Sequence, residues 1–521
     1  MGRKEIVAVI AIGAAVLLVS ILPYLYGYHI TPIGKEYMGI HGINEYDTYT
    51  YLSWIEQARE GHFYFKNLYT AEAQLALLVN PVFFITGFLA SFSNLSNIVV
   101  YHIARIVVSA AFLFLLYLFI SVFIKRPAHR ILAFVVVTTS SGLGILFGGS
   151  STDLWMTETI TFLNIYESVL NTFSLALVLG VFLLVIYKFQ NKSLLPVAAA
   201  AICMNLLTLT HTYDFILVIG IVGLYCLIKA LLEKDTAYIR NVLYLLLFSF
   251  PAILWQGYVL EKNSSFALWA TLQSSVPAYA PVYYLMGYGF LVIFAIVGVV
   301  YAWRRKVSKY SFLYIWVAVS VILMYLPFLE RFQRKFSEGL HIPIAILASL
   351  GIIWWVNYLG ESRRKTKILL SGLIVLYLSL TNFKVVYRDL RLFKTGERMY
   401  YMNQTELSAV RWLKYNSPPD SVILAANQMG NIIPGISGRT VYIGYNTITS
   451  HYDQKYETLK KMLQRPDLKP AMFSSFLRTN GIDYILIDSQ MREINAVNFD
   501  SYPFLNTVYE QEQVKIYKVN L

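Results

Sequence analysis

The sequence is poor in charged residues and in cysteine. Only 14% of its 521 residues are Asp, Glu, Lys or Arg, whereas soluble globular chains carry roughly 25%. So few ionised side chains cannot cover the surfaces of several soluble domains. The hydrophobic content of 57% also excludes intrinsic disorder and a collagen-like chain. The two cysteines, Cys203 and Cys226, both lie in long apolar runs, so we expect buried hydrophobic residues and neither a disulfide nor a Cys/His metal site.

Long apolar runs are abundant instead. About 20 helical residues cross a hydrocarbon core, and eleven runs near this length lie between Ile6 and Asn382. We therefore predict a polytopic α-helical membrane protein with about eleven transmembrane helices. The first run is too long for a signal peptide, and we expect it to be retained. The predicted spans are 6–28, 97–124, 130–149, 167–187, 193–211, 213–232, 240–260, 283–303, 310–329, 340–359 and 367–383.

Basic and acidic residues are divided between two sets of connections. One set carries 18 of the 27 Lys and Arg residues that precede position 386, and the other carries 13 of the 17 acidic residues. Because basic flanks stay cytoplasmic, we predict a cytoplasmic N-terminus and an extracytoplasmic region after Asn382, in a prokaryotic plasma membrane. The net charge of +13 then reports orientation, and we expect no nucleic-acid partner.

The predicted external segments are longer than the cytoplasmic ones. The longest is the first external loop, 29–96, and shorter ones lie near 150–166, 261–282 and 330–339. From residue 385 onward no run is long enough to span a membrane. We therefore predict a transmembrane domain over 1–384 and a C-terminal extracytoplasmic α/β domain over 385–521. Its predicted strands are Ser421–Ala425, Val441–Gly444 and Tyr484–Ile487, and its predicted helices are Glu406–Asn416, Tyr456–Leu463 and Met472–Thr479, with turns at 435–438.

Several ionisable residues on the external side could carry chemistry. Glu45 and Asp47 directly follow the first helix, and Glu158 lies in the second external loop. His211 and Asp214 interrupt a long apolar stretch at an external hairpin. Charges near membrane depth are costly and usually face a polar cavity. For Glu45 and Asp47, a solvated interfacial loop is the alternative.

The last external connection places three basic residues on the acidic side of the chain. It contains Arg331, Arg334 and Lys335, flanked by Glu330 and, further on, by Glu338 and His341. The three cations could clamp a specific phosphate, since Arg gives bidentate hydrogen bonds. Alternatively they bind outer-leaflet lipid phosphates, or they pair with Glu330 and Glu338.

Carboxylates and cations on one membrane face suit the transfer of a sugar from a polyprenyl phosphate to an acceptor hydroxyl or amine. The leaving phosphate needs no proton, because Arg331, Arg334 or Lys335 can neutralise its charge. The nucleophile needs a base, and we assign this role to Asp47, with Glu45 beside it. Direct in-line attack would invert the anomeric carbon.

Five further polar residues are expected to support this reaction by contacting the acceptor or the sugar, or by holding the residues that do. They are Glu158, His211, Asp214, Glu338 and His341.

No spacing in the sequence demands a metal ion, although Asp47, Glu45 and Glu158 could hold Mg²⁺ or Mn²⁺ through oxygen ligands. The expected partners are the polyprenyl-phosphate sugar, membrane lipids and an extracytoplasmic acceptor.

This architecture resembles the GT-C superfamily of integral-membrane glycosyltransferases, which use lipid-phosphate-linked sugars. Glu45-Tyr46-Asp47 is similar to the DXD/EXD pattern of that superfamily, which implies that Asp47 or Glu45 is catalytic. The stretch 47–81 is similar to the amphipathic jaw of the same loop. The protein O-mannosyltransferases and the lipid A aminoarabinose transferase are the nearest familiar relatives. The Trp-Trp-Asp signature of oligosaccharyltransferases is missing from the external region, so we do not expect asparagine-linked transfer.

Two other functions stay open. A flippase or transporter of lipid-linked glycans, without covalent chemistry, would need polar residues that continue to the cytoplasmic face. Few ionisable residues lie at mid-depth apart from His211 and Asp214, which favours the glycosyltransferase. A sugar-binding scaffold without catalysis would show an accessible Asp47 with no cavity beside it.

Overall fold

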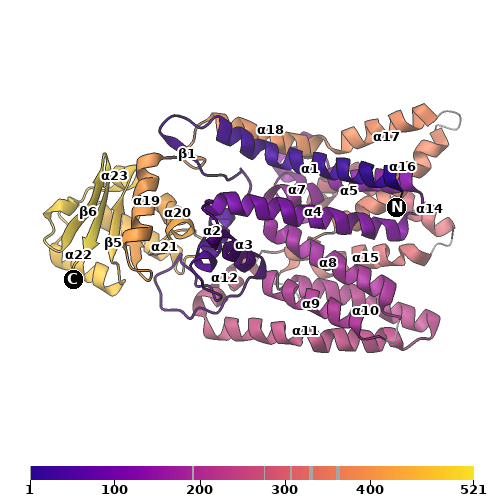
Figure 1. Cartoon of the computed structure of the whole chain (residues 1–521), viewed down its shortest axis with the longest axis horizontal. Helices are drawn as coiled ribbons and strands as arrows, with labels where there is room; N and C mark the ends of the chain where they lie inside the picture. Colours follow the sequence, from indigo (N-terminus) through magenta and orange to yellow (C-terminus); the bar gives the residue numbers. More distant parts are fainter. Residues whose placement is uncertain (1, 191–192, 275, 306–307, 328–331, 360–363) are drawn as a thin grey trace. The chain divides into compact units, whose positions relative to one another are not determined.

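The fold is given by a computed structural model that describes residues 2–190, 193–274, 276–305, 308–327, 332–359 and 364–521 (Figure 1). Packing divides the chain into two compact units. The first comprises Met1–Leu25, Ile103–Gln256 and Ser274–Arg391, and the second comprises Tyr26–His102, Gly257–Gln273 and Leu392–Leu521. The second unit thus joins the loop after the first helix to the C-terminal region. The predicted boundary at residue 384 concerns which residues lie in the membrane, and it stays a prediction.

The apolar runs form helices, most of which belong wholly or mainly to the first unit. Short 3₁₀ helices accompany them at η1 (Gly148–Ser150), η2 (Thr152–Leu154), η3 (Thr157–Thr159), η4 (Ser308–Tyr310) and η5 (Gln333–Ser337). The α-helices are α1 (Arg3–His29), α4 (Asn97–Phe123), α5 (Pro127–Thr139), α6 (Gly144–Phe147), α7 (Thr161–Glu167), α8 (Val169–Lys188), α9 (Leu195–Thr210), α10 (Asp214–Glu233), α11 (Ala237–Lys262), α13 (Pro281–Tyr288), α14 (Phe290–Arg304), α15 (Ser311–Tyr325), α16 (His341–Leu359), α17 (Arg364–Leu378) and α18 (Leu380–Lys394).

Several of these helices can cross a membrane. Within the described ranges, seven are long and apolar enough, and up to nine spans result if each of two bent pairs counts as one. The bent pairs are α13 with α14, at 84°, and α17 with α18, at 47°. The predicted spans 193–211 and 310–329 correspond to α9 and α15, which have only 16 and 15 residues. The chain is a mostly helical integral membrane protein, while the total of about eleven spans and their orientation stay predictions.

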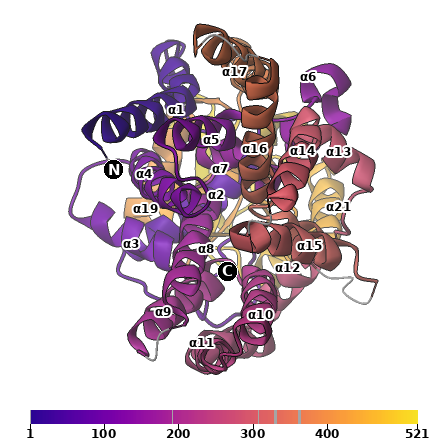
Figure 2. The ribbon, with the colours of Figure 1, turned by 90° about the vertical axis from the view of Figure 1, so that its right-hand side faces the viewer.

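Glycine allows two helices of the first unit to pack closely. Helices α14 and α16 lie side by side (Figure 2). A Cβ atom at Gly298 would lie 1.9 Å from the carbonyl oxygen of Leu347, and one at Gly351 would lie 2.0 Å from that of Phe294. Only residues without a Cβ let the two backbones approach this far, which is a common device of membrane helix pairs.

The second unit combines helices with two small sheets. Strand β1 (Lys35–Tyr37) pairs antiparallel with β2 (Tyr401–Asn403), and Glu36 lies opposite Met402. The larger sheet has the order β4-β3-β5-β7-β6, in which β3 is parallel to β4 and β5, and β7 is antiparallel to β5 and β6. The elements are α2 (Glu45–Arg59), α3 (Pro81–Ser91), α12 (Ser264–Ser274), α19 (Gln404–Asn416), β3 (Val422–Leu424), α20 (Asn427–Ser437), β4 (Thr440–Val441), α21 (Tyr452–Leu463), α22 (Pro470–Thr479), β5 (Tyr484–Ile487), α23 (Ser489–Ile494), η6 (Phe499–Ser501), β6 (Leu505–Gln511) and β7 (Val514–Val519).

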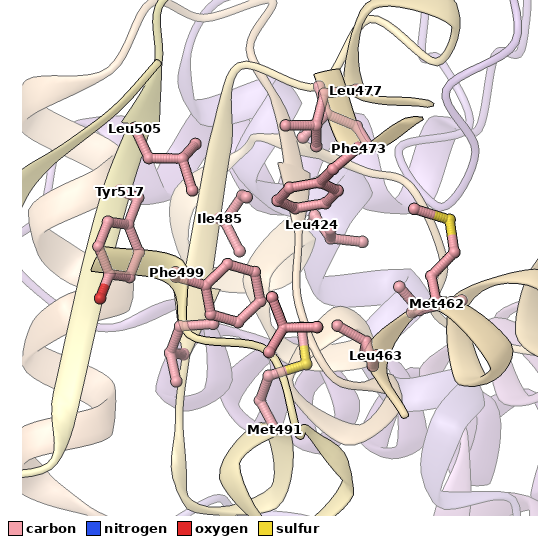
Figure 3. Close-up of a cluster of buried hydrophobic side chains, with 14 of the residues drawn as sticks. Leu424, Met462, Leu463, Phe473, Leu477, Ile485, Met491, Phe499, Leu505 and Tyr517 are labelled. Atoms are coloured by element: carbon pink, nitrogen blue, oxygen red, sulfur yellow. The ribbon is translucent and has the colours of Figure 1, made fainter. Parts of the chain in front are cut away.

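Apolar side chains from this sheet and its helices form one core (Figure 3). Leu424 of β3 and Ile485 of β5 are fully buried, as is Leu477 of α22, and Phe473 is nearly so. All four residues of β5 are buried, which is typical of a central strand covered on both faces. Two of the three predicted strands and all three predicted helices of this region are present, while the predicted strand Val441–Gly444 overlaps β4 only at Val441. The turns predicted at 435–438 are wrong, because α20 continues to Ser437, and neither α20 nor the β6–β7 hairpin was predicted.

Helix α2 is anchored firmly in the second unit. Tyr49, Leu52 and Ile55 recur at helical spacing and are buried. A Cβ at Gly87 of α3 would lie 2.4 Å from the carbonyl oxygen of Ile55, so α3 can pack this closely only with glycine there. Glu56 accepts a 2.6 Å hydrogen bond from the Asn97 side chain. These contacts fix the helix that carries Glu45 and Asp47.

Candidate functional site

Glu45 and Asp47 lie in the first turn of α2. Asn44, the residue before the helix, has a φ of 49° and a ψ of 42°, a left-handed conformation that Asn adopts more readily than most residues. Carboxylates at this end of a helix interact favourably with the macrodipole. Both side chains are half-buried. The helix start therefore gives two carboxylates fixed positions at its exposed end.

Asp47 is held by a residue that the sequence did not reveal. Tyr445 lies in the connection after β4, and its Oη donates a 3.0 Å hydrogen bond to Oδ1 of Asp47. The ring of Tyr445 also packs on Tyr46, with 5.5 Å between ring centroids. Burial and the charge of Asp47 raise the pKa of Tyr445 well above its usual value, so its hydroxyl stays protonated and donates.

The carboxyl ends of parallel strands often carry ligand-binding residues, and Tyr445 follows this rule. Its connection is fixed by Thr449, whose hydroxyl donates to the carbonyl of Tyr69 and accepts from the backbone of Gly444. Tyr445 lies 398 residues after Asp47 in the sequence, so two distant stretches of chain together set the position of the Asp47 carboxylate.

The other predicted polar residues meet in the first unit, around Glu158 of η3. Lys335 Nζ lies 2.6 Å and Arg334 Nη2 lies 3.4 Å from Oε1 of Glu158. Burial alone would raise the pKa of Glu158, but the charges of Lys335 and Arg334 outweigh it and hold that pKa well below its usual range. Glu158 is therefore an ionised, buried partner of both cations. Arg334 and Lys335 thus pair with Glu158, and among the described residues neither forms an ion pair with Glu338, whereas any pairing of Arg331 or Glu330 stays a prediction.

The hairpin between α9 and α10 borders the same cluster. His211 Nδ1 lies 3.0 Å from Oδ2 of Asp214, and Tyr213 bonds to the other ring nitrogen of His211. Lys335 Nζ lies 5.5 Å from the ring centroid of Tyr213. Glu338 is buried, and among the described residues neither of its oxygens has a hydrogen-bond partner. It interacts electrostatically with Asp214, Glu158 and Lys335. Six of the predicted residues therefore lie in one polar cluster, namely Glu158, Arg334, Lys335, His211, Asp214 and Glu338.

His341 and Arg331 differ from this group. His341 is buried and its ring nitrogens lie 3.1 Å from Ser140 Oγ and 2.9 Å from Thr161 Oγ1, so its observed partners are neutral hydroxyl groups. Arg331 and Glu330 lie outside the described residues. The predicted roles of all these side chains in binding phosphate, sugar or acceptor stay predictions.

Within the described ranges, no group of three or more His, Cys, Asp or Glu side chains could hold a metal ion. The prediction that Asp47, Glu45 and Glu158 hold Mg²⁺ or Mn²⁺ stays a prediction.

Comparison with known proteins gives structural likeness only. Neither a protein-family model nor a curated protein matches the sequence. The oligosaccharyltransferase AglB of Archaeoglobus fulgidus, in complex with an inhibitory peptide and a dolichol-phosphate, matches with a TM-score of 0.56 and 12% identity over 94% of this chain and 70% of that one.

Two further solved structures are similar. The Archaeoglobus fulgidus oligosaccharyltransferase tethered with an acceptor peptide matches with a TM-score of 0.55 and 11% identity, over 93% of this chain and 69% of that one. ArnT from Cupriavidus metallidurans, bound to undecaprenyl phosphate, has a TM-score of 0.48 and 12% identity, over 100% and 99% of the two chains. At such low identity the likeness to the oligosaccharyltransferases concerns the fold: the chain has the fold of the GT-C membrane glycosyltransferases that its sequence resembles.

Proposed function

We propose that the chain is a membrane glycosyltransferase, which transfers a sugar from a polyprenyl-phosphate-linked donor to an extracytoplasmic lipid, glycan or protein. The observation that carries the proposal is the fold shared with AglB, a protein solved with a dolichol-phosphate. Asp47 supports it, because this carboxylate lies at the start of α2 in the loop after the first apolar helix, within the pattern typical of the superfamily.

The reaction we propose is a single displacement at the anomeric carbon. The bond between that carbon and the phosphate oxygen breaks, and the phosphate leaves with the electron pair. The acceptor oxygen or nitrogen forms the new bond, and its proton passes to Asp47 as general base. Attack from the face opposite the phosphate inverts the anomeric carbon. The Tyr445 hydroxyl would keep the carboxylate oriented through its 3.0 Å hydrogen bond.

The charge of the leaving phosphate has candidate partners in Arg334 and Lys335. Both cations face Glu158, so a lipid phosphate would compete with this carboxylate for them. Positively charged donors near a developing negative charge lower the barrier most effectively in a site that excludes water. We therefore keep Arg334 and Lys335 as the proposed phosphate ligands, together with Arg331.

The test is sugar transfer in detergent from a polyprenyl-phosphate sugar, comparing wild type with Asp47→Asn. Loss of a general base lowers the rate by about 100- to 10,000-fold, and we expect a loss in that range. Glu36→Gln is the matched control, since Glu36 belongs to the same unit and forms an exposed ion pair with Arg411, with an N–O distance of 2.7 Å. Full activity of Asp47→Asn would refute the proposed base. Counterflow of a lipid-linked glycan in proteoliposomes without any covalent product would favour a flippase.

A further inference from the structure

Helix α3 is apolar on two opposite faces, of which one is buried and the other is exposed. The buried face packs on α2, where Gly87 permits the close approach (Figure 1). The opposite face carries four apolar side chains that are all at least 48% exposed, namely Ile85, Phe88, Leu89 and Phe92. Their spacing of three or four residues places them along one side of the helix. We call this surface the α3 face.

Phenylalanine rings make the α3 face continuous. The ring of Phe63, from the turn after α2, lies 4.9 Å from that of Phe84, measured between ring centroids. Phe84 lies 6.1 Å from Phe88, and Phe88 lies 5.2 Å from Phe92. The apolar surface therefore runs along the whole length of α3.

The segment around α3 is uncharged. No Asp, Glu, Lys or Arg occurs between Glu72 and Arg105. A helix at a protein–water surface usually turns charged or polar side chains toward the solvent, and contiguous exposed apolar surface marks a site of contact with protein or membrane. The α3 face is therefore suited to an apolar partner.

The connection to α4 indicates which partner this is. Helix α4, one of the helices able to cross a membrane, begins at Asn97, five residues after Phe92. Arg59 at the end of α2 fixes this connection, because its guanidinium donates 2.8 Å hydrogen bonds to the carbonyls of Ser93 and Leu95 and a 3.1 Å bond to Asn97 Oδ1. The end of α3 is thus held close to the start of a membrane helix.

Helix lengths set the depth of both elements. The 27 residues of α4 extend for about 40 Å, close to the thickness of a bilayer with its headgroups, so its first turn reaches headgroup level. The 11 residues of α3 extend for only about 16 Å and cannot cross a hydrocarbon core of about 30 Å.

We propose that the α3 face inserts into the leaflet where α4 begins, so that α3 lies in the membrane surface with its other face on α2. Interfacial helices bury their apolar face about 5–10 Å deep, at the boundary of headgroups and acyl chains. Residues 81–92 would then be embedded in lipid, although they lie in a segment that the sequence assigns to an external loop. A second copy of the chain could also cover an apolar face, but the fixed connection to α4 favours lipid.

Lipid insertion of α3 would also position α2. The first turn of α2 carries Asp47, and the two helices pack closely at Ile55 and Gly87. If the proposed function holds, α3 therefore keeps the base near the surface at which the phosphate of a lipid-linked donor lies. The lipid contact itself does not depend on that function.

The experiment locates α3 by fluorescence quenching of the full-length chain in lipid nanodiscs. Phe88→Cys and Phe92→Cys, each in a background with Cys203→Ala and Cys226→Ala, carry an NBD label. Lipids with a nitroxide near the headgroup or near the end of the acyl chain serve as quenchers. Tyr415→Cys is the matched control, because Tyr415 on α19 of the same unit is 79% exposed and Phe92 is 77% exposed.

We expect the shallow nitroxide to remove most of the fluorescence at both α3 positions, the deep nitroxide to quench them less, and Tyr415→Cys to stay unquenched. Absence of quenching at Phe88 and Phe92, or equal quenching at Tyr415, would overturn the inference, as would stronger quenching by the deep nitroxide. Disulfide cross-linking of two chains through Phe92→Cys, without lipid quenching, would assign the face to a second copy instead. If both α3 positions are quenched but the wild type transfers no sugar, the lipid contact stands and the proposed function fails.

Discussion

Replacing Glu158 with Gln tests the ion-pair cluster of the first unit most directly. Gln keeps nearly the same shape, so the substitution removes one negative charge and leaves Lys335 and Arg334 facing a neutral amide. The side chains of Glu158, Lys335 and Arg334 are only 7%, 17% and 21% exposed. The freed cations therefore cannot be fully solvated without local rearrangement.

The expected size of the effect follows from this burial. Removing one partner of a buried ion pair is destabilising by about 3–5 kcal/mol, whereas an exposed pair contributes about 0–1 kcal/mol. Because both cations keep some contact with solvent, we expect Glu158→Gln to lower the free energy of unfolding by about 3 kcal/mol. The double variant with Lys335→Met should lose less than the two single losses added together, by about 1–3 kcal/mol, since the pair interacts directly.

The assay is SDS-induced unfolding from mixed micelles for the wild type, both single variants and the double variant. Lys229→Met is the control, because Lys229 and Glu233 form a 2.6 Å pair on α10 whose side chains are 27% and 42% exposed. We expect this variant to lose less than about 1 kcal/mol. If Glu158→Gln loses no more than Lys229→Met, or if the two cluster substitutions add without interaction, the buried ion pair does not stabilise the fold and the reasoning fails.

Three further predictions concern the pKa of Glu158, the hydrogen bond from Tyr445 to Asp47, and the packing of α3 on α2. The pKa of Glu158 is lowered in the folded chain, so the ionised carboxylate stabilises the fold above the ordinary carboxyl pKa, and this stabilisation is lost as the pH falls below about 4. Unfolding in SDS at graded pH should therefore show a free energy of unfolding that decreases in acid, and Glu158→Gln should make this decrease smaller. Tyr445→Phe removes the hydrogen bond to Asp47, and steady-state transfer kinetics should show kcat reduced about 10-fold with the KM for the donor unchanged, whereas an unchanged kcat would exclude a positioning role. Gly87→Ala places a Cβ 2.4 Å from a carbonyl oxygen of α2 and should lower the free energy of unfolding by about 1–3 kcal/mol, whereas Gly372→Ala, with no atom within 4 Å of the added carbon, should leave it unchanged or raise it.

The helical runs were predictable because apolar length alone specifies them, but breaks within a run were not. The predicted span 283–303 divides at Gly289, which has a φ of 52°, and the two halves meet at 84°. Composition is apolar on both sides of this break, so hydropathy cannot locate it. Only the glycine marked the position, and glycine is also common in unbroken membrane helices.

In the C-terminal region, local preference and tertiary packing disagree. Helix α20 contains Gly430, Pro434 and Gly435, which disfavour helix. It forms because it packs against α2: a Cβ at Gly435 would lie only 3.0 Å from that of Leu52. The β6–β7 hairpin turns at Glu512, a residue with a φ of 52° where Gly or Asn is usual, so the expected turn signal is missing.

The candidate site was also predictable only in part. Glu158, Arg334 and Lys335 were found individually, because each charge interrupts an apolar or acidic pattern. Their mutual pairing was not predicted, since it depends on how η3 and η5 pack. Tyr445 had no sequence signal at all, because one tyrosine among 40 is unremarkable until the fold brings it to Asp47.

The pairing of β1 with β2 has a consequence for biosynthesis. Strand β1 and helix α2, in the loop after the first helix, are synthesised long before their partners β2 and α20. Translation at about 5–20 residues per second separates these events by roughly 20–70 seconds. During that interval the face of α2 that packs on α20 has no partner from the C-terminal region. A ribosome-bound chain that ends before β2 should therefore be cut by protease within the first loop, and the full chain should be protected there.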